Sequence, residues 1–160
     1  MRKKELLERK RYKKLTLEYL LRLFYAVDIS GKDFDTTVEE IDREIHLPEN
    51  YKNQIRQIVT TYTQHENEIN HLISSHLVGW RLDRIGFLER ATLRIWVSYI
   101  LYLRSILPKQ MFLREIGYII SFMLELLECY GVPKRTVKFV HGVISSILKE
   151  QTEKVNTKTV

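Results

Sequence analysis

Helical periodicity is the feature of this sequence that most constrains its fold. Only three prolines and six glycines occur in 160 residues, so long stretches are uninterrupted, and apolar residues recur in them at intervals of three and four. That spacing lines one face of an α-helix. One such stripe consists of Leu17, Leu20, Leu21, Phe24 and Val27. No segment alternates apolar and polar residues for long enough to indicate a strand. The sequence therefore predicts an all-α fold of six to seven helices.

Glycines and capping residues indicate where several of these helices begin and end. Thr37 is expected to begin the second helix, with Glu40 completing a capping box. Asp83 is expected to cap the long helix that follows it, and Gly131 is typical of a helix C-terminus. The sequence leaves open whether the third helix continues through His65 or stops there.

The first fourteen residues carry the whole net charge of the chain. Their basic residues are Arg2, Lys3, Lys4, Arg9, Lys10, Arg11, Lys13 and Lys14. Only Glu5 and Glu8 oppose these eight cations, which leaves 18 basic and 18 acidic side chains in the rest of the chain and a net charge of +6 overall. Clustered cations gain affinity for polyanions by releasing condensed counterions. This basic arm favours a nucleic acid or an anionic membrane as partner, with a solubilising tail as the alternative.

Length and composition indicate one globular domain with short polar ends. We expect residues 1–14 to form a basic, partly flexible arm, residues 15–151 a single all-helical domain, and residues 152–160 a polar tail. No apolar run reaches the roughly 18 residues that a membrane span needs, and the charged N-terminus lacks the apolar core of a signal peptide. Cys129 is the only cysteine, so no disulfide can form within the chain. These features predict a cytoplasmic protein.

No pattern of catalytic or metal-binding residues stands out. His71 and His76 are five residues apart, so a helix places them on different faces, where they form a poor metal pair. The chain lacks a glycine-rich phosphate loop and a G-x-S-x-G nucleophile elbow. The acidic run at residues 39–44 is typical of a solvated helix face. The sequence therefore predicts no enzyme activity, no metal and no cofactor.

Four short motifs occur in a distinctive order along most of the chain. Near the N-terminus the basic run precedes LFYAVDI at residues 23–29. Residues 80–95 then read WRLDRIGFLERATLRI, residues 125–131 read ELLECYG, and residues 138–144 read KFVHGVI. In this order and spacing the motifs resemble the NusB family of bacterial transcription antitermination factors. The resemblance is weakest over residues 30–75.

The resemblance implies a NusB-like fold of two packed helical bundles. It also implies binding of boxA, a single-stranded segment of ribosomal RNA leader transcripts, together with NusE, a small-subunit ribosomal protein, in a complex that acts on RNA polymerase. Single-stranded RNA is held by cations on phosphates and aromatic rings on bases. The residues expected to contact RNA are the eight arm cations Arg2, Lys3, Lys4, Arg9, Lys10, Arg11, Lys13 and Lys14, together with Tyr25, Lys138 and Phe139.

Two further positions are expected at the NusE interface. Glu89 matches an acid of the family that faces this partner, and Arg94 lies just over one helical turn further on. For Tyr25 and Phe139, packing in the core is an alternative to RNA contact, because each has apolar neighbours at helical spacing. Trp80 is expected in the core.

Two departures from the family pattern stand out. His141 occupies the position where the family has asparagine before a glycine. Between Pro108 and Tyr130 the chain has about seven extra residues, which is two helical turns, so the helices around Pro108 are expected to be lengthened.

Three other functions stay open. The first is a NusB-fold homodimer or ribosome-assembly adaptor that does not bind boxA, for which the apolar stretch at residues 116–127 would suit a helix–helix interface. The second is a fragment of an RNA cytosine methyltransferase, since one such family carries a NusB-like domain, although the chain has no methyl-donor site. The third is membrane-surface binding by the arm, which offers only Leu6, Leu7 and Tyr12 as apolar anchors.

Overall fold

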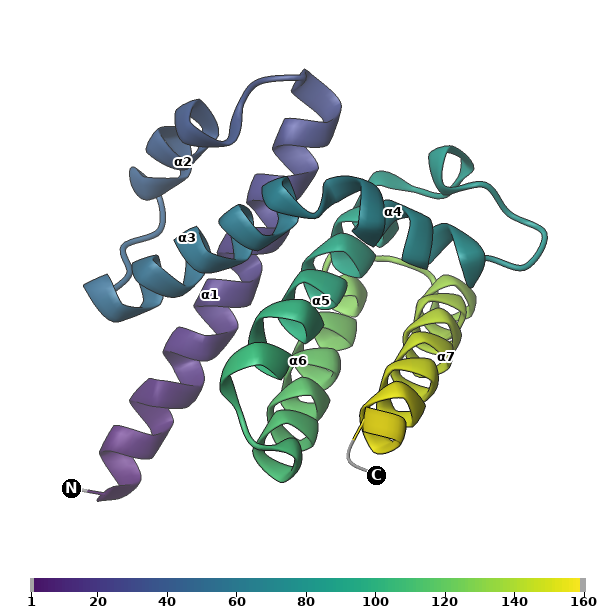
Figure 1. Ribbon diagram of the computed structural model, residues 1–160. Coiled ribbons are helices and arrows are strands. Elements are labelled where there is room, and N and C mark those ends of the chain that lie inside the picture. Colours follow the sequence, from purple (N-terminus) through teal and green to yellow (C-terminus); the bar gives the residue numbers. More distant parts are fainter. Residues whose placement is uncertain (1, 159–160) are drawn as a thin grey trace.

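Seven α-helices and one short 3-10 helix form the part of the chain that this computed structural model describes, residues 2–158, and no strand occurs there (Figure 1). The elements are α1 (Arg2–Ser30), α2 (Phe34–Asp42), α3 (Glu49–Gln64), α4 (Glu66–Ser75), the 3-10 helix η1 (Leu82–Arg84), α5 (Phe87–Ile106), α6 (Lys109–Cys129) and α7 (Lys134–Lys158). The all-α prediction is confirmed. None of these helices is both long and apolar enough to cross a bilayer.

The helices pack as two bundles joined through α5. This helix contacts α1, α3, α4, α6 and α7, while α2 and α3 pack against α1. In Figure 1 α1 to α3 lie on one side and α5 to α7 lie side by side on the other. Between residues 91 and 100 only Arg94 is not fully buried, which explains why the apolar pattern of this segment continues around the helix. The predicted two-bundle fold is confirmed.

One apolar core runs through both bundles, and it includes tyrosine rings. Tyr19, Trp96 and Tyr99 are among its largest fully buried side chains. The Tyr19 hydroxyl donates a hydrogen bond to Asp42 Oδ1 (2.7 Å). Burial, reinforced by Asp42, raises the pKa of Tyr19, and burial likewise raises the pKa of Tyr99. Both phenols therefore stay neutral, which is the form that an apolar core tolerates.

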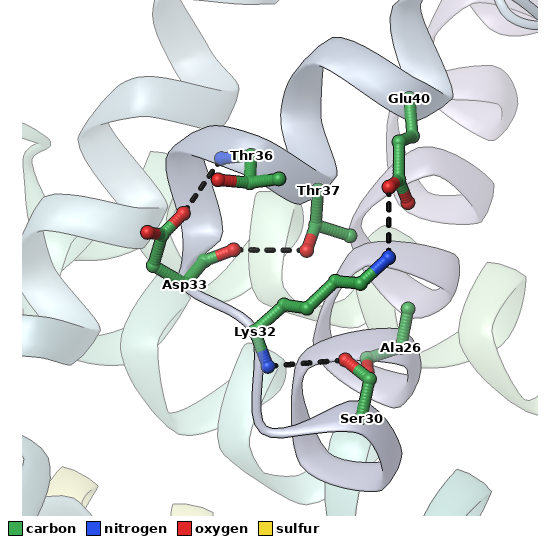
Figure 2. A network of polar contacts seen from close by, with 7 residues as sticks. All are labelled: Ala26, Ser30, Lys32, Asp33, Thr36, Thr37 and Glu40. Atoms are coloured by element: carbon green, nitrogen blue, oxygen red, sulfur yellow. Dashed lines mark hydrogen bonds and ion pairs between the residues drawn. The ribbon is translucent and has the colours of Figure 1, made fainter.

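The corner between α1 and α2 ends the first helix through a glycine and a serine (Figure 2). Gly31 has φ +71°, a left-handed conformation that glycine adopts without a steric penalty. Its N–H donates to the Val27 carbonyl (3.0 Å). The Ser30 hydroxyl donates to the Ala26 carbonyl (2.6 Å) and accepts from the Lys32 N–H (3.1 Å). The bond from Gly31 satisfies the Val27 carbonyl, one of the four that the end of α1 leaves unpaired.

Asp33 caps the N-terminus of α2, four residues before the predicted start at Thr37. Its carboxylate accepts from the Thr36 backbone N–H (2.7 Å), and its carbonyl accepts from the Thr37 hydroxyl (2.8 Å) (Figure 2). The bond from Thr36 lowers the pKa of the Asp33 carboxyl below its ordinary value. Glu40 pairs with Lys32 (2.9 Å). The predicted capping box is wrong, because Asp33 satisfies the free N–H groups of the helix earlier in the chain.

Two other helix boundaries bear on the sequence predictions. One answers the open question at His65, and the other corrects the predicted cap at Asp83. The chain bends at His65, which separates α3 from α4. Asp83 lies inside η1 and does not cap α5, whose N-cap residue is Gly86. The Asp83 carboxylate instead pairs with Arg81 (2.8 Å), so it is not available to the first N–H groups of α5.

Gly131 closes α6 as the sequence predicts. Its φ is +81°. The Gly131 N–H donates to the Glu128 carbonyl and the Val132 N–H donates to the Leu127 carbonyl, both at 3.0 Å, which is the bond pair of a Schellman motif. Helix α7 then continues beyond residue 151, where the polar tail was expected to begin. Residues 159 and 160 of that expected tail lie outside the described residues.

Candidate nucleic-acid interface

The basic arm forms the N-terminal part of α1. Residues 2–11 are exposed, and Figure 1 shows this end of α1 extending away from the other helices. Leu6 and Leu7 keep 62% and 61% of their surface exposed, so the rest of the protein covers little of the arm. The structure thus presents the arm as a helix with its cations in solvent. Its partial flexibility stays a prediction.

Lys13 and Lys14 differ from the other arm cations because both pair with acids of α6. Lys13 Nζ lies 3.1 Å from Glu115 Oε1. Lys14 Nζ lies 3.4 Å from Glu125 Oε1. The two lysine side chains are 42% and 45% exposed. Of the eight cations expected to contact RNA, these two therefore already have a carboxylate partner within the chain.

Two separate hollows lie beside α1 between the arm and Tyr25. Residues 14, 18, 22 and 25 are spaced so that they share one face of this helix. A hollow of about 440 Å³ lies beside Lys14, Glu18 and Phe122, and another of about 460 Å³ lies beside Tyr25 and Tyr130. The hydroxyl of Tyr130, which lines the second hollow, donates to Oε1 of Glu18, which lines the first (3.4 Å). Partial burial and Glu18 raise the pKa of Tyr130, so its phenol is a neutral donor.

Tyr25 lies at the surface, in contact with a second exposed ring. Tyr25 and Phe87 are 38% and 42% exposed, and their ring centroids lie 6.2 Å apart in an edge-to-face arrangement. Phe87 is the first residue of α5, and its other neighbour is Arg90, whose guanidinium lies 4.4 Å from the ring centroid. The structure therefore places Tyr25 outside the core, next to a ring that the sequence analysis did not single out.

A third hollow, of about 630 Å³, brings Phe139 and Glu89 together. Trp80, Arg84 and Arg135 also line it. Trp80 is 59% exposed, so its predicted place in the core is wrong. The reason is local, because Trp80 follows the α4 helix end in a loop rather than on a helix face. Phe139 is half-buried and packs against the core, so it serves the fold and the surface at once.

Lys138 is exposed beside Phe139 on α7, as a residue that contacts RNA would need to be. Arg84 and Arg135 bring two cations to the hollow that Phe139 lines. Sequence reasoning missed these two arginines, and it also missed Tyr130 and Phe87. The available signal was their position, since all four lie at helix ends or in turns, where side chains point outward more often than in helix centres.

Glu89 stands in the first turn of α5, at the positive end of the helix dipole. Its carboxylate lies over Gly86, since a Cβ placed on that glycine would be 2.0 Å from Glu89 Oε2. No described residue forms an ion pair with Glu89. Its charge therefore faces the hollow, where a partner could meet it, and its contact with NusE stays a prediction.

Arg94 has an intramolecular role that the sequence analysis did not foresee. Its side chain, 17% exposed, lies 3.3 Å from Asp28 and donates from Nε to Asn70 Oδ1 (3.0 Å). Arg90 also donates to Asp28 (3.0 Å). Asp28 and the two arginines belong to two of the four family motifs, which thus meet in space and tie α1 to α5. Little of Arg94 is left for contact with a partner protein.

The histidines and acids of the described part of the chain do not form a metal cluster. His76, one of the two considered in the sequence, connects α4 to α7. Its Nδ1 lies 2.7 Å from Ser146 Oγ, and its Nε2 contacts the Glu150 carboxylate. These contacts give His76 a structural role between two helices.

Fold and surface together define the class of this protein. It is an all-helical protein whose first helix carries cations at one end and approaches exposed aromatic rings at the start of the central helix with its other end, with two hollows beside it. A model of the NusB family matches residues 15–149, which is most of the chain. The chain therefore belongs to the NusB family, and the resemblance seen in its four motifs is confirmed.

Relatives and solved structures agree with this assignment. The transcription antitermination protein NusB of Persephonella marina is 31% identical over 148 residues, covering 91% of this chain and 98% of that protein. A crystal structure of the antitermination factors NusB and NusE in complex with dsRNA contains a chain with TM-score 0.73 and 28% identity, over 88% of this chain and 98% of that one. A crystal structure of a plectonemic RNA supercoil contains another similar chain, with TM-score 0.75 and 29% identity, over 89% of this chain and 97% of that one.

Proposed function

We propose that this chain is an RNA-binding transcription antitermination factor. It binds boxA-type single-stranded RNA of ribosomal RNA leader transcripts together with NusE, and the complex acts on RNA polymerase in the bacterial cytoplasm. The function rests on binding and requires no catalytic group, metal or cofactor. The antitermination protein of Persephonella marina and the solved NusB–NusE–dsRNA complex support this proposal by their similarity to the chain.

The observation that carries the proposal is that one helix, α1, has exposed cations at one end and an exposed ring near the other. Helix α1 has 29 residues, which makes it about 43 Å long. Six arm cations that do not pair with α6 stand at its N-terminal end. Tyr25 stands near its other end beside Phe87, and two hollows lie along α1 between the arm and Tyr25. Proteins that bind single strands combine a cationic groove for the backbone with rings on which bases stack. Bases inside a duplex would not reach the rings, so the surface favours a single strand.

A titration with labelled boxA-type single-stranded RNA tests the proposal. We expect binding by the chain alone, tighter binding when NusE is added, and weaker binding of an RNA with the same composition in scrambled order. Equal affinity for boxA-type and scrambled RNA, with and without NusE, would remove boxA recognition from the proposal. No RNA binding at all would overturn it.

Glu89 provides a test of the partner alone. A Glu89→Lys variant reverses one charge beside the hollow, so we expect weaker association with NusE. RNA binding by the isolated variant should stay the same or rise slightly, because the change adds a cation. Glu68→Lys is the matched control, since Glu68 lies on α4 outside this hollow. Unaltered NusE affinity in the Glu89 variant would exclude Glu89 from the interface.

The alternative of a NusB-fold homodimer or ribosome-assembly adaptor has no specific observation in its favour. The apolar stretch at residues 116–127 was the feature that suited a helix–helix interface. Its members Ile116, Ile119, Met123 and Leu127 are buried in the core of the chain itself, so these four are not available to a second copy. Tyr118 of the same stretch is exposed, and it lies under Lys13 of the arm.

A further inference from the structure

Helix α6 turns an unusual face toward the arm. Glu115, Tyr118, Phe122 and Glu125 follow one another at helical spacing, so they share one side of α6. The rings of Tyr118 and Phe122 are nearly parallel, with an interplanar angle of 17° and centroids 6.4 Å apart. Tyr118 is 47% exposed. The face therefore consists of two rings with a carboxylate at either end.

Each of two arm lysines meets one acid and one ring of this face. Lys13 Nζ lies 3.1 Å from Glu115 Oε1 and 5.7 Å from the centroid of the Tyr118 ring. Lys14 Nζ lies 3.4 Å from Glu125 Oε1 and 5.3 Å from the centroid of the Phe122 ring. An anionic oxygen and an aromatic face are the same two kinds of group that a single-stranded RNA offers to a lysine.

We propose that Glu115 and Glu125 compete with RNA phosphates for Lys13 and Lys14, and so set how strongly and how selectively the arm binds polyanions. This inference rests on the proposed function, because it concerns the same RNA. A phosphate that approaches either lysine must displace or share with a carboxylate. Both ion pairs are partly exposed, with the two acids 27% and 56% exposed, and exposed pairs are weak enough for a dense polyanion to displace.

The competition has a signature in the salt dependence of binding. A phosphate that binds an unpaired lysine releases a condensed counterion. A phosphate that displaces a carboxylate leaves that acid exposed, and the acid then attracts a cation from solution, so the net release is smaller. The wild-type chain should therefore show a shallower salt dependence than its number of arm cations implies. Removing the two acids should restore the missing counterion release and steepen the salt dependence.

The Glu115→Gln/Glu125→Gln double variant tests the proposal by titration with labelled single-stranded RNA. We expect RNA affinity to rise about three- to tenfold, the size that exposed ion pairs allow. The log–log salt slope should steepen by up to about 1.4, which is about 0.7 for each of two lysines. A Glu66→Gln/Glu68→Gln variant changes the net charge by the same amount on α4, away from the arm. It should show a smaller gain in RNA affinity and a smaller change in the salt slope than the variant at 115 and 125. A melting curve checks that each variant folds.

A Lys13→Gln/Lys14→Gln variant separates competition from positioning. In the double-glutamine background at 115 and 125 these two changes should cost most of what that background gained, and they should cost less RNA affinity than this in the wild-type background. If the acids instead position the lysines for RNA, removing the acids will weaken binding. Weaker or unchanged binding in the folded acid variant overturns the proposal.

Inorganic polyphosphate, which has no bases, separates this proposal from the proposed function. The acid variant should gain affinity for polyphosphate as well, since the competition concerns phosphate groups alone. A chain that binds polyphosphate but no RNA would overturn the proposed function and leave the competition in place. A wild-type chain that binds RNA, with no gain in the acid variant for either ligand, would overturn the competition and leave the function in place.

Discussion

Asp28 accepts a hydrogen bond from Arg90 and forms an ion pair with Arg94. Both arginines are mostly buried. The side chains of Arg90 and Arg94 are 10% and 17% exposed, and that of Asp28 is 21% exposed. At the scale of single residues, this network shows that motif residues can serve the fold: the aspartate of the first motif neutralises the arginines of the second. A charge this far from water is costly when its partner is missing.

We therefore expect Asp28→Ala to destabilise the protein strongly. Removal of the carboxylate leaves both guanidinium groups without their anion, which should lower the free energy of unfolding by about 3 kcal/mol, near the low end for buried pairs because Asp28 keeps some exposure. Urea unfolding measures this. Glu44→Ala is the control, since Glu44 pairs with Arg22 at the surface and its loss should cost under about 1 kcal/mol. Equal losses in the two variants would contradict the role given to Asp28.

Tyr25 is the residue that most directly tests ring stacking. Its exposed ring contacts Phe87 at the surface, whereas Phe139 is half-buried and an alanine there would disturb the core as well. Tyr25→Leu should weaken RNA binding by about 1–3 kcal/mol, a typical value for one stacked base, with little change in melting temperature. Tyr25→Phe keeps the ring and should bind RNA like the wild type. If the leucine and phenylalanine variants bind RNA equally, no base stacks on this residue.

At the scale of the element, α1 changes character along its length. Residues 2–11 are exposed, while Tyr12 packs against Tyr51 with ring centroids 5.3 Å apart and Lys13 and Lys14 pair with α6. The stripe that begins at Leu17 is buried in the core. The helix is thus a core element at one end and a presented cationic surface at the other.

Deleting residues 2–11 should leave the fold intact. These residues contribute little buried surface, so the melting temperature should change by less than about 3 °C, which corresponds to about 1 kcal/mol for a chain of this size. Deleting residues 2–14 also removes the Tyr12 ring contact and both ion pairs, and should lower the melting temperature further. Equal melting temperatures for the two truncated proteins would show that residues 12–14 do not anchor α1.

Local patterns predicted the helices well, because helix faces and glycine caps are properties of neighbouring residues. The stripe from Leu17 and the cap at Gly131 are examples. Features that depend on distant residues were missed. Arg94 takes its role from Asp28 on another helix, and Lys13 and Lys14 take theirs from acids about a hundred positions away. The wrong prediction of Trp80 in the core has a local reason instead, since this residue lies in the loop after α4 and not on a helix face.

At the scale of the whole molecule, charge and shape are arranged unevenly. The net charge of the chain lies on the first fourteen residues of one helix, and the exposed rings Tyr25, Phe87 and Trp80 lie around the start of α5. A balanced helical body therefore presents one cationic end and one aromatic surface. A single strand that follows α1 would meet phosphate-binding groups first and base-binding groups further along.

The salt dependence of boxA-type RNA binding tests this arrangement most directly. If about five arm cations neutralise phosphates, the log–log slope of affinity against salt should be about −3.5, so that binding weakens about a hundredfold between about 50 and 200 mM salt. The chain without residues 2–11 has lost six of its arm cations, and its slope should be much shallower. A slope near zero in the full chain, or the same slope in both proteins, would contradict the account of RNA lying along α1.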